Sequence, residues 1–238
     1  VWFFLIGLSA YTLAHVIKPR SSIFKFVAVI FYQFNFFILQ GWWIGEKSKF
    51  SAYVAMPLVL SVFLLVDSGR LSPVAGAILN SFIFFFFNAG GLFGIPLYGG
   101  LFVTVASFIL FSVVTHAFTK NFLAVRRILF LTILSVVLAI AVNAYYLFPA
   151  VMKLQKQLAT NVAQAGGISG VISWADEISA SASFLNLMRL QGIPEWYDNP
   201  EHPFAKIILS RPIFIAISFL WALFVFASLF LVRERSVR

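Results

Sequence analysis

Long apolar runs, separated by short polar or glycine- and proline-containing stretches, dominate the sequence. Cutting the chain at charges, prolines and glycine clusters leaves seven apolar segments: residues 1–17, 23–45, 51–67, 73–93, 97–118, 127–149 and 211–232. A helix that crosses the hydrocarbon core of a bilayer needs about 20 mainly apolar residues. The pattern therefore predicts an all-α, polytopic transmembrane helix bundle with about seven spans, of which the first and third are short.

One sizeable stretch of the sequence is polar, and it separates the sixth apolar segment from the seventh. The pattern thus predicts three regions. Residues 1–149 form a transmembrane bundle of six spans, residues 150–210 form an extracytoplasmic loop with one or two short helices, and residues 211–238 form the last transmembrane helix and a basic cytoplasmic tail.

Two helices are expected within the polar loop. Residues 153–164 continue the sixth segment as an amphipathic helix that ends at a pair of glycines. A second helix is predicted from Ser173 to Leu190, because Ser173 is a favourable N-cap residue with an acid, Asp176, three positions later. A glycine and a proline follow its end, where they stop a helix.

Composition supports a membrane environment. Hydrophobic residues make up 61% of the chain, charged residues make up 11%, and the mean hydropathy is +0.97, whereas about a quarter of a soluble domain is charged. The lipid bilayer is therefore the expected partner. The net charge of +9 does not predict nucleic-acid binding, since the basic residues lie in short loops between apolar runs. Without cysteine, disulfides and thiolate sites are excluded.

The distribution of basic residues predicts the orientation. Alternate short loops and the C-terminal tail hold ten basic residues, whereas the opposite short loops hold Lys47 and Lys49. Because lysine and arginine concentrate on the cytoplasmic side, we expect the N-terminus of this chain outside, the C-terminus in the cytoplasm and the polar loop outside, in a plasma membrane. Aromatic residues at the predicted outer ends agree with this orientation.

Adjacent acids in the external loop are candidates for chemistry. Asp176 and Glu177 have the carboxylates needed to act as a base or, with His202, Glu201 or Asp198, to bind a divalent cation. The alternative is structural, because acids in the first turn of a helix stabilise it through its dipole and its unpaired N–H groups. No spacing typical of a metal site surrounds these residues, so the sequence predicts no metal site. His116, at a cytoplasmic helix end, is expected to be interfacial.

Polar amides inside the predicted spans are a second candidate group. Asn35 and Asn143 are expected either to line a cavity or to bond to a neighbouring helix, because an unpaired amide in hydrocarbon costs several kcal/mol. No charged residue lies deep within a span, which argues against an ion pump or a proton relay. The glycine-rich, charge-free stretch 88–100 is either a tight turn or a re-entrant loop.

Several short fragments carry a resemblance to a known superfamily. They are Gly7–Tyr11 with Leu13 and Ala14, Ser22, Ala28, Tyr32–Asn35, Trp42-Trp43, Ala55–Leu58, Asn143–Pro149 and Ser183–Leu190. Together they resemble multi-pass membrane proteins of the GT-C glycosyltransferase superfamily, particularly its arabinofuranosyltransferase-like and YfhO-like members. The resemblance implies transfer of a sugar from a polyprenyl-phosphate donor at the outer face.

The resemblance does not supply a catalytic residue. It implies an acidic residue in the first external loop, sometimes with a divalent metal, and that loop would lie before Val1. Because the chain starts without methionine and inside an apolar run, we expect it to be part of a longer protein. Asn186 and Arg189 match the superfamily's loop pattern, with no role implied for either.

Three hypotheses follow. The first is the membrane core of a GT-C-like glycosyltransferase that acts on a lipid-linked sugar, with Asp176, Glu177, Arg189 and His202 as candidate external-site residues. The second is a non-catalytic transmembrane subunit of a larger membrane complex. The third is a transporter of a lipidic solute, for which broken helices around the glycine-rich stretch would be the pointer.

Overall fold

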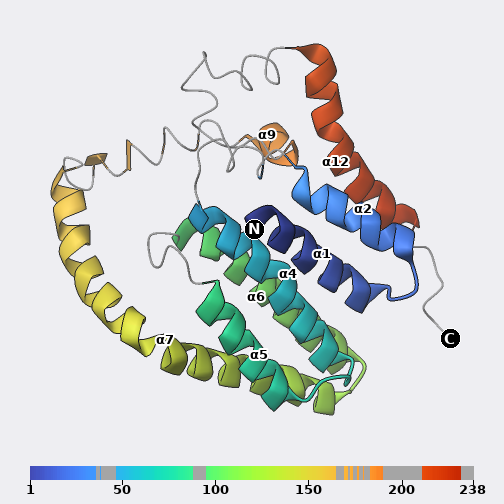
Figure 1. Cartoon of the computed structure of the whole chain (residues 1–238), viewed down its shortest axis with the longest axis horizontal. Helices are drawn as coiled ribbons and strands as arrows, with labels where there is room; N and C mark the ends of the chain where they lie inside the picture. The colour runs from blue at the N-terminus through green and yellow to red at the C-terminus, as the bar shows by residue number, and fades with distance from the viewer. Residues whose placement is uncertain are drawn as a thin grey trace. The chain divides into compact units, whose positions relative to one another are not determined.

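The structure, a computed structural model, describes residues 1–35, 38, 47–87, 95–164, 169–170, 172–173, 176, 179, 183–189 and 211–231. The regular elements in this part of the chain are helices, so the predicted all-α class is confirmed. In chain order they are α1 (Trp2–Ile17), α2 (Ser22–Gln33), α4 (Lys47–Asp67), α5 (Pro73–Phe86), α6 (Ile95–Phe118), α7 (Phe122–Gln164), α9 (Phe184–Met188) and α12 (Pro212–Leu231) (Figure 1).

The chain forms two compact units, Val1–Lys156 and Gln157–Arg238. The first holds α1 to α6 and most of α7, and the second holds the end of α7 with α9 and α12.

Three helices in the described part of the chain are long and apolar enough to cross a membrane. Their apolar windows are Phe50–Asp67 in α4, Leu101–Phe118 in α6 and Phe122–Tyr145 in α7. They coincide with three of the predicted spans. The shorter apolar helices α1 and α5 fall within two others, and α2 overlaps a third, beginning one residue before it. The chain is thus a multi-pass, α-helical protein suited to a bilayer.

Helix α4 is the centre of the first unit. It packs against α1, α5 and α6 (Figure 1), and 61% of its apolar window is buried, against 11% for α6 and 22% for α7. One core cluster joins it to α5 and α7 through Val59, Phe63, Val66, Ala77, Ile128 and Leu131. The other joins it to α1 and to Ile38, which follows α2 in the chain, through Ile6, Ile38, Phe50 and Val54.

Large apolar side chains cover the outer faces of the helices. Phe111 on α6 is 70% exposed, Ile133 on α7 is 65% exposed and Phe26 on α2 is 67% exposed. In water such faces would drive association. In a bilayer lipid covers them, and the helical backbone has already satisfied its own polar groups.

Short polar side chains start the helices at one end of the first unit. The side-chain oxygens of Ser21, Ser72 and Asn121 each accept a hydrogen bond from the backbone N–H three residues later, at 3.2, 3.3 and 3.3 Å. These N-caps begin α2, α5 and α7.

Helices α4 and α6 end at the same end of the unit in tight turns with a left-handed residue. Gly69 has φ of +72° and Lys120 has φ of +56°. The residue after each of them donates its backbone N–H to the carbonyl oxygen five residues earlier. These hydrogen bonds are Arg70 N to Leu65 O at 2.9 Å and Asn121 N to His116 O at 2.8 Å. This is the Schellman arrangement that satisfies the last helical carbonyls.

The second predicted span, 23–45, differs from the structure. Helix α2 ends at Gln33, and Phe34 and Asn35 are in a bend. The reason is the side chain of Asn35, whose Oδ1 accepts a hydrogen bond from Ile38 N at 3.1 Å. Such a bond competes with continuation of the helix and caps a new one.

The polar loop is partly as predicted. Helix α7 runs unbroken from Phe122 to Gln164, which confirms the expected helical continuation beyond the sixth span. The single helix predicted from Ser173 to Leu190 is wrong, because Ser183 is not helical. Ser183 Oγ instead accepts from Asn186 N at 3.2 Å and caps the short helix α9. Residues 88–94 of the glycine-rich stretch lie outside the described residues.

Candidate functional site

Arg189, just after α9, is held against the last helix. Its Nε donates a hydrogen bond to Ser218 Oγ of α12 at 2.7 Å, and its guanidinium carbon lies 5.6 Å from the centroid of the Phe219 ring. The side chain is 8% exposed. A hydrogen bond to Ser218 and a cation–π contact with Phe219, the next residue of α12, therefore hold the guanidinium in place. An arginine side chain is always positively charged in a protein.

The position of Ser218 defines how far this cation reaches along α12. Ser218 lies six residues beyond Pro212, which corresponds to about 9 Å along the helix axis. Arg189 therefore contacts α12 within its first two turns.

The other predicted loop residues are less constrained or lie outside the description. Asp176 is helical and exposed, and its backbone oxygen accepts from Ser179 Oγ at 2.9 Å. Glu177 and His202 lie outside the described residues. Among the residues that the structure describes, no three His, Cys, Asp or Glu side chains gather in a way that would hold a metal ion.

Asn35 lies in a buried polar cluster with two tyrosines. Its Nδ2 donates to Tyr53 Oη of α4 and to Tyr32 O, both at 2.9 Å. The Tyr32 and Tyr53 rings stack with centroids 4.4 Å apart, and Tyr32 Oη donates to Tyr53 O at 2.7 Å. Asn35 is 1% exposed. Its amide thus joins α2 to α4 inside the bundle.

Two further asparagines are buried in the first unit. Asn143 donates to Ala139 O of its own helix α7 at 2.8 Å. Asn80 on α5 donates from Nδ2 to Ser135 Oγ on α7 at 3.0 Å. Asn35 and Asn143, both predicted to line a cavity or to bond to other helices, therefore use their amides in hydrogen bonds within the first unit.

A close approach of α1 and α2 depends on a glycine. Gln33 Nε2 donates to Phe3 O at 2.7 Å, and a Cβ atom on Gly7 would lie 2.3 Å from the same Nε2. Only a residue without a side chain leaves room for this hydrogen bond. Gly7 and Gln33 belong to two of the fragments that carry the GT-C resemblance.

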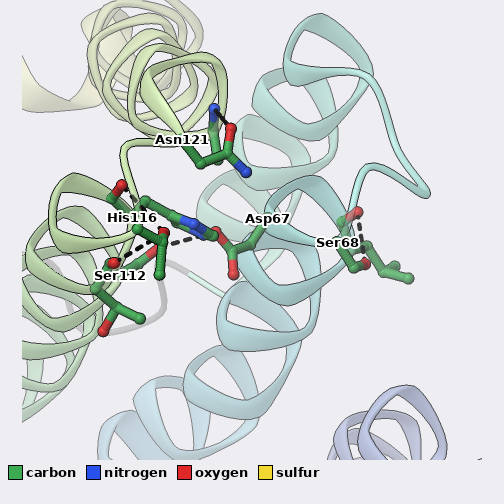
Figure 2. A network of polar contacts seen from close by, with 9 residues as sticks. Asp67, Ser68, Ser112, His116 and Asn121 are labelled. Atoms are coloured by element: carbon green, nitrogen blue, oxygen red, sulfur yellow. Dashed lines mark hydrogen bonds and ion pairs between the residues drawn. The ribbon is translucent and has the colours of Figure 1, made fainter. Parts of the chain in front are cut away.

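Asp67, Ser112 and His116 form a polar contact that the sequence did not suggest. Ser112 Oγ and His116 Nε2 both lie 2.8 Å from Asp67 Oδ1, joining the end of α4 to the last two turns of α6 (Figure 2). His116 was expected to be a lone interfacial residue. The sequence does show that Ser112 and His116 are four residues apart and so share a face of their helix. Nothing in the sequence indicates that Asp67 faces them.

The order of contacts in this group decides its chemistry. The serine hydroxyl bonds to the carboxylate and not to the imidazole, so the group lacks the nucleophile-to-base hydrogen bond of a serine hydrolase. The arrangement is that of an interhelical tie. Asp67 and His116 are about a quarter exposed, at 25% and 22%.

Comparison with known proteins gives no family, no curated protein and no solved structure that matches this chain.

Proposed function

We propose that this chain crosses the plasma membrane seven times, with its N-terminus outside, and forms the membrane core of a GT-C-like glycosyltransferase that uses a polyprenyl-phosphate-linked sugar at the outer face. The observation that carries the proposal is the guanidinium of Arg189, fixed against Ser218 and Phe219 near the start of α12. In the proposed topology this start lies at the outer surface.

The Arg189 side chain is suited to bind a phosphate group near the start of α12. Guanidinium binds phosphate oxygens through charge-assisted hydrogen bonds in a fixed planar geometry. A polyprenyl phosphate presents its phosphate just outside the hydrocarbon, and the contact with Ser218 keeps Arg189 within about 9 Å of the predicted outer end of α12. The chain therefore offers a fixed cation within about 9 Å of the level where the lipid-linked donor carries its charge.

The basic residues support the topology. Lys18 and Arg20 lie between α1 and α2, Arg70 lies between α4 and α5, and Lys120 lies between α6 and α7. By the concentration of basic residues on the cytoplasmic side, these turns face the cytoplasm. Helices α1 and α2 are shorter than a full span, and the proposal assigns them to the first span and to the first part of the second.

A second candidate function has its own support. Asn35 and Asn143 are 1% and 4% exposed and hydrogen-bonded within the first unit, so neither amide presents a group to a substrate. A non-catalytic membrane subunit of a larger complex would use such amides only for packing. Purification of the chain in a stoichiometric complex whose transferase activity resides in another subunit would favour this alternative.

Binding of decaprenyl monophosphate to the full chain in nanodiscs tests the proposal. Arg189→Met removes the charge but keeps a long side chain, and Arg211→Met, at the exposed residue preceding α12, is the matched control. We expect Arg189→Met to weaken binding about tenfold, as for a charge-assisted hydrogen bond worth about 1.5 kcal/mol, and Arg211→Met to change it less than twofold. Absence of binding by the unmodified chain, or equal losses in both variants, would contradict the proposal.

A further inference from the structure

Seven of the basic residues of the first unit lie in or beside three turns between its helices. Arg70 Nη2 donates to Val16 O at 3.2 Å, which joins the turn after α4 to the end of α1. A Cβ atom on Gly69 would lie 3.2 Å from Arg127 Nη1, which places the same turn beside the start of α7. The three turns therefore lie together at one end of the helices (Figure 1). We call this surface the basic end; its cations are Lys18, Arg20, Lys25, Arg70, Lys120, Arg126 and Arg127.

The basic end has almost no acid to balance it. Residues 1–156 contain two acidic residues, Glu46 and Asp67. Asp67 already accepts hydrogen bonds from Ser112 and His116. Glu46 lies outside the described residues and, in the sequence, directly precedes the first residue of α4. Five of the seven cations, those other than Lys25 and Arg127, are exposed. Within residues 1–156, the cations of the basic end therefore outnumber the acids seven to two.

The surroundings of these cations are apolar. Phe118 is 85% exposed, Phe122 is 69% exposed and Leu123 is 60% exposed, on either side of Lys120. On the neighbouring turn, Lys25 Nζ lies 5.4 Å from the ring centroid of Tyr11. Cations beside exposed aromatic and aliphatic side chains suit a ligand with an anionic headgroup and a hydrocarbon tail.

We propose that the basic end is a binding surface for anionic phospholipids, with phosphate headgroups held by Arg70, Lys120 and Arg126 and acyl chains lying along Phe118 and Phe122. A soluble anion would satisfy the charges but not the apolar side chains, and a zwitterionic lipid would satisfy the apolar side chains but bring no net charge. This inference does not depend on sugar transfer. The proposed transfer takes place at the outer side, where Lys47 and Lys49 are expected, whereas the basic end lies at the opposite end of the helices.

Native mass spectrometry of the detergent-purified full chain tests this inference. The probes are phosphatidylglycerol, phosphatidylcholine of the same acyl chains, and glycerol 3-phosphate as the soluble headgroup. We expect phosphatidylglycerol to bind at least about tenfold more tightly than phosphatidylcholine, because each basic residue near an anionic lipid contributes a several-fold gain. Raising the salt concentration should reduce this preference.

Two triple variants remove the same number of charges from different places. Arg70→Gln, Lys120→Gln and Arg126→Gln together change the basic end, and we expect them to abolish the preference for phosphatidylglycerol. Lys47→Gln, Lys49→Gln and Arg211→Gln together are the control, and we expect them to keep it. All three side chains of the first set are exposed. The hydrogen bond that Arg70 donates to Val16 O lies at the end of α1, so helical content by circular dichroism should stay unchanged. Equal binding of the two lipids, equal losses in both variants, or binding of glycerol 3-phosphate as tight as that of phosphatidylglycerol would each overturn the proposal.

Discussion

Tyr32 on α2 donates its hydroxyl to the backbone oxygen of Tyr53 on α4, at 2.7 Å. Tyr53 stands four residues before Pro57, which lies inside α4. Proline has no N–H, so the carbonyl four residues earlier lacks its usual helical donor. The side chain of a neighbouring helix supplies that donor, and the proline in α4 is thereby matched to a tyrosine in α2.

This match predicts how two substitutions interact. Tyr32→Phe removes the donor to a buried carbonyl and should lower the free energy of unfolding by about 1–2 kcal/mol. Pro57→Ala restores a helical N–H, so in that background Tyr32→Phe should cost less than half as much. Unfolding by sodium dodecyl sulfate in mixed micelles measures all four corners of the cycle. Additive effects would show that the tyrosine hydroxyl does not replace the helical donor.

The close approach of α1 and α2 at Gly7 gives a second prediction. Gly7→Ala would place a methyl group 2.3 Å from Gln33 Nε2, which is too close for two atoms that are not bonded. The Gln33 amide must therefore move and lose its hydrogen bond to Phe3 O. We expect a loss of about 1–2 kcal/mol. In a Gln33→Ala background the same change should be nearly neutral, since the obstructing amide is gone. Leu8→Ala, at a partly lipid-facing neighbour that is 46% exposed, serves as the control.

A different outcome would locate the clash elsewhere. If Gly7→Ala were equally harmful with and without the Gln33 amide, the glycine would be required by the backbone of α2 and not by this side chain.

How far the sequence predicts this structure depends on the range of the interactions involved. The all-α class and the positions of α4, α6 and α7 follow from apolar runs, because burial in lipid acts on every residue of a span. The break at Asn35 and the cap at Ser183 were missed, because a single side-chain-to-backbone bond decides each of them and polar residues of the same type also occur inside helices.

The candidate site was harder to predict for a related reason. Arg189 was selected from its fragment, but its contacts with Ser218 and Phe219 join residues about 30 positions apart. Asp67 and His116 are joined across 49 positions. Pairings of this range depend on how helices rotate against one another, and the apolar pattern of lipid-facing helices fixes that rotation only loosely.

The interhelical tie at Asp67 gives a third prediction. Asp67→Asn keeps the shape of the side chain but weakens both hydrogen bonds, which should lower stability by about 0.5–1.5 kcal/mol; partial exposure keeps the effect at the smaller end. Ser112→Ala and His116→Gln should each cost less once Asp67 is asparagine. Thermal unfolding in detergent, with double-mutant cycles, measures this coupling. A cycle with no coupling energy would mean that the carboxylate and its two neighbours act independently.

The last prediction concerns a buried acceptor, Asn80 Oδ1, for which the described residues provide no donor. Asn80 is fully buried on α5, and its Nδ2 bonds to Ser135 Oγ on α7, but in the described part of the chain its Oδ1 has no hydrogen-bond partner. A buried unpaired carbonyl oxygen costs about 1–3 kcal/mol, whereas an interhelical hydrogen bond in a membrane protein contributes about 0.6 kcal/mol.

Replacing both partners by apolar residues, as Asn80→Leu with Ser135→Ala, should therefore raise stability by about 1 kcal/mol in the same unfolding assay. Asn80→Ala is the contrasting variant, because it removes the amide but leaves a cavity and should destabilise the bundle. If the double variant is instead clearly less stable than the unmodified chain, the Oδ1 atom of Asn80 has a partner such as a buried water, and the amide holds α5 and α7 together through it.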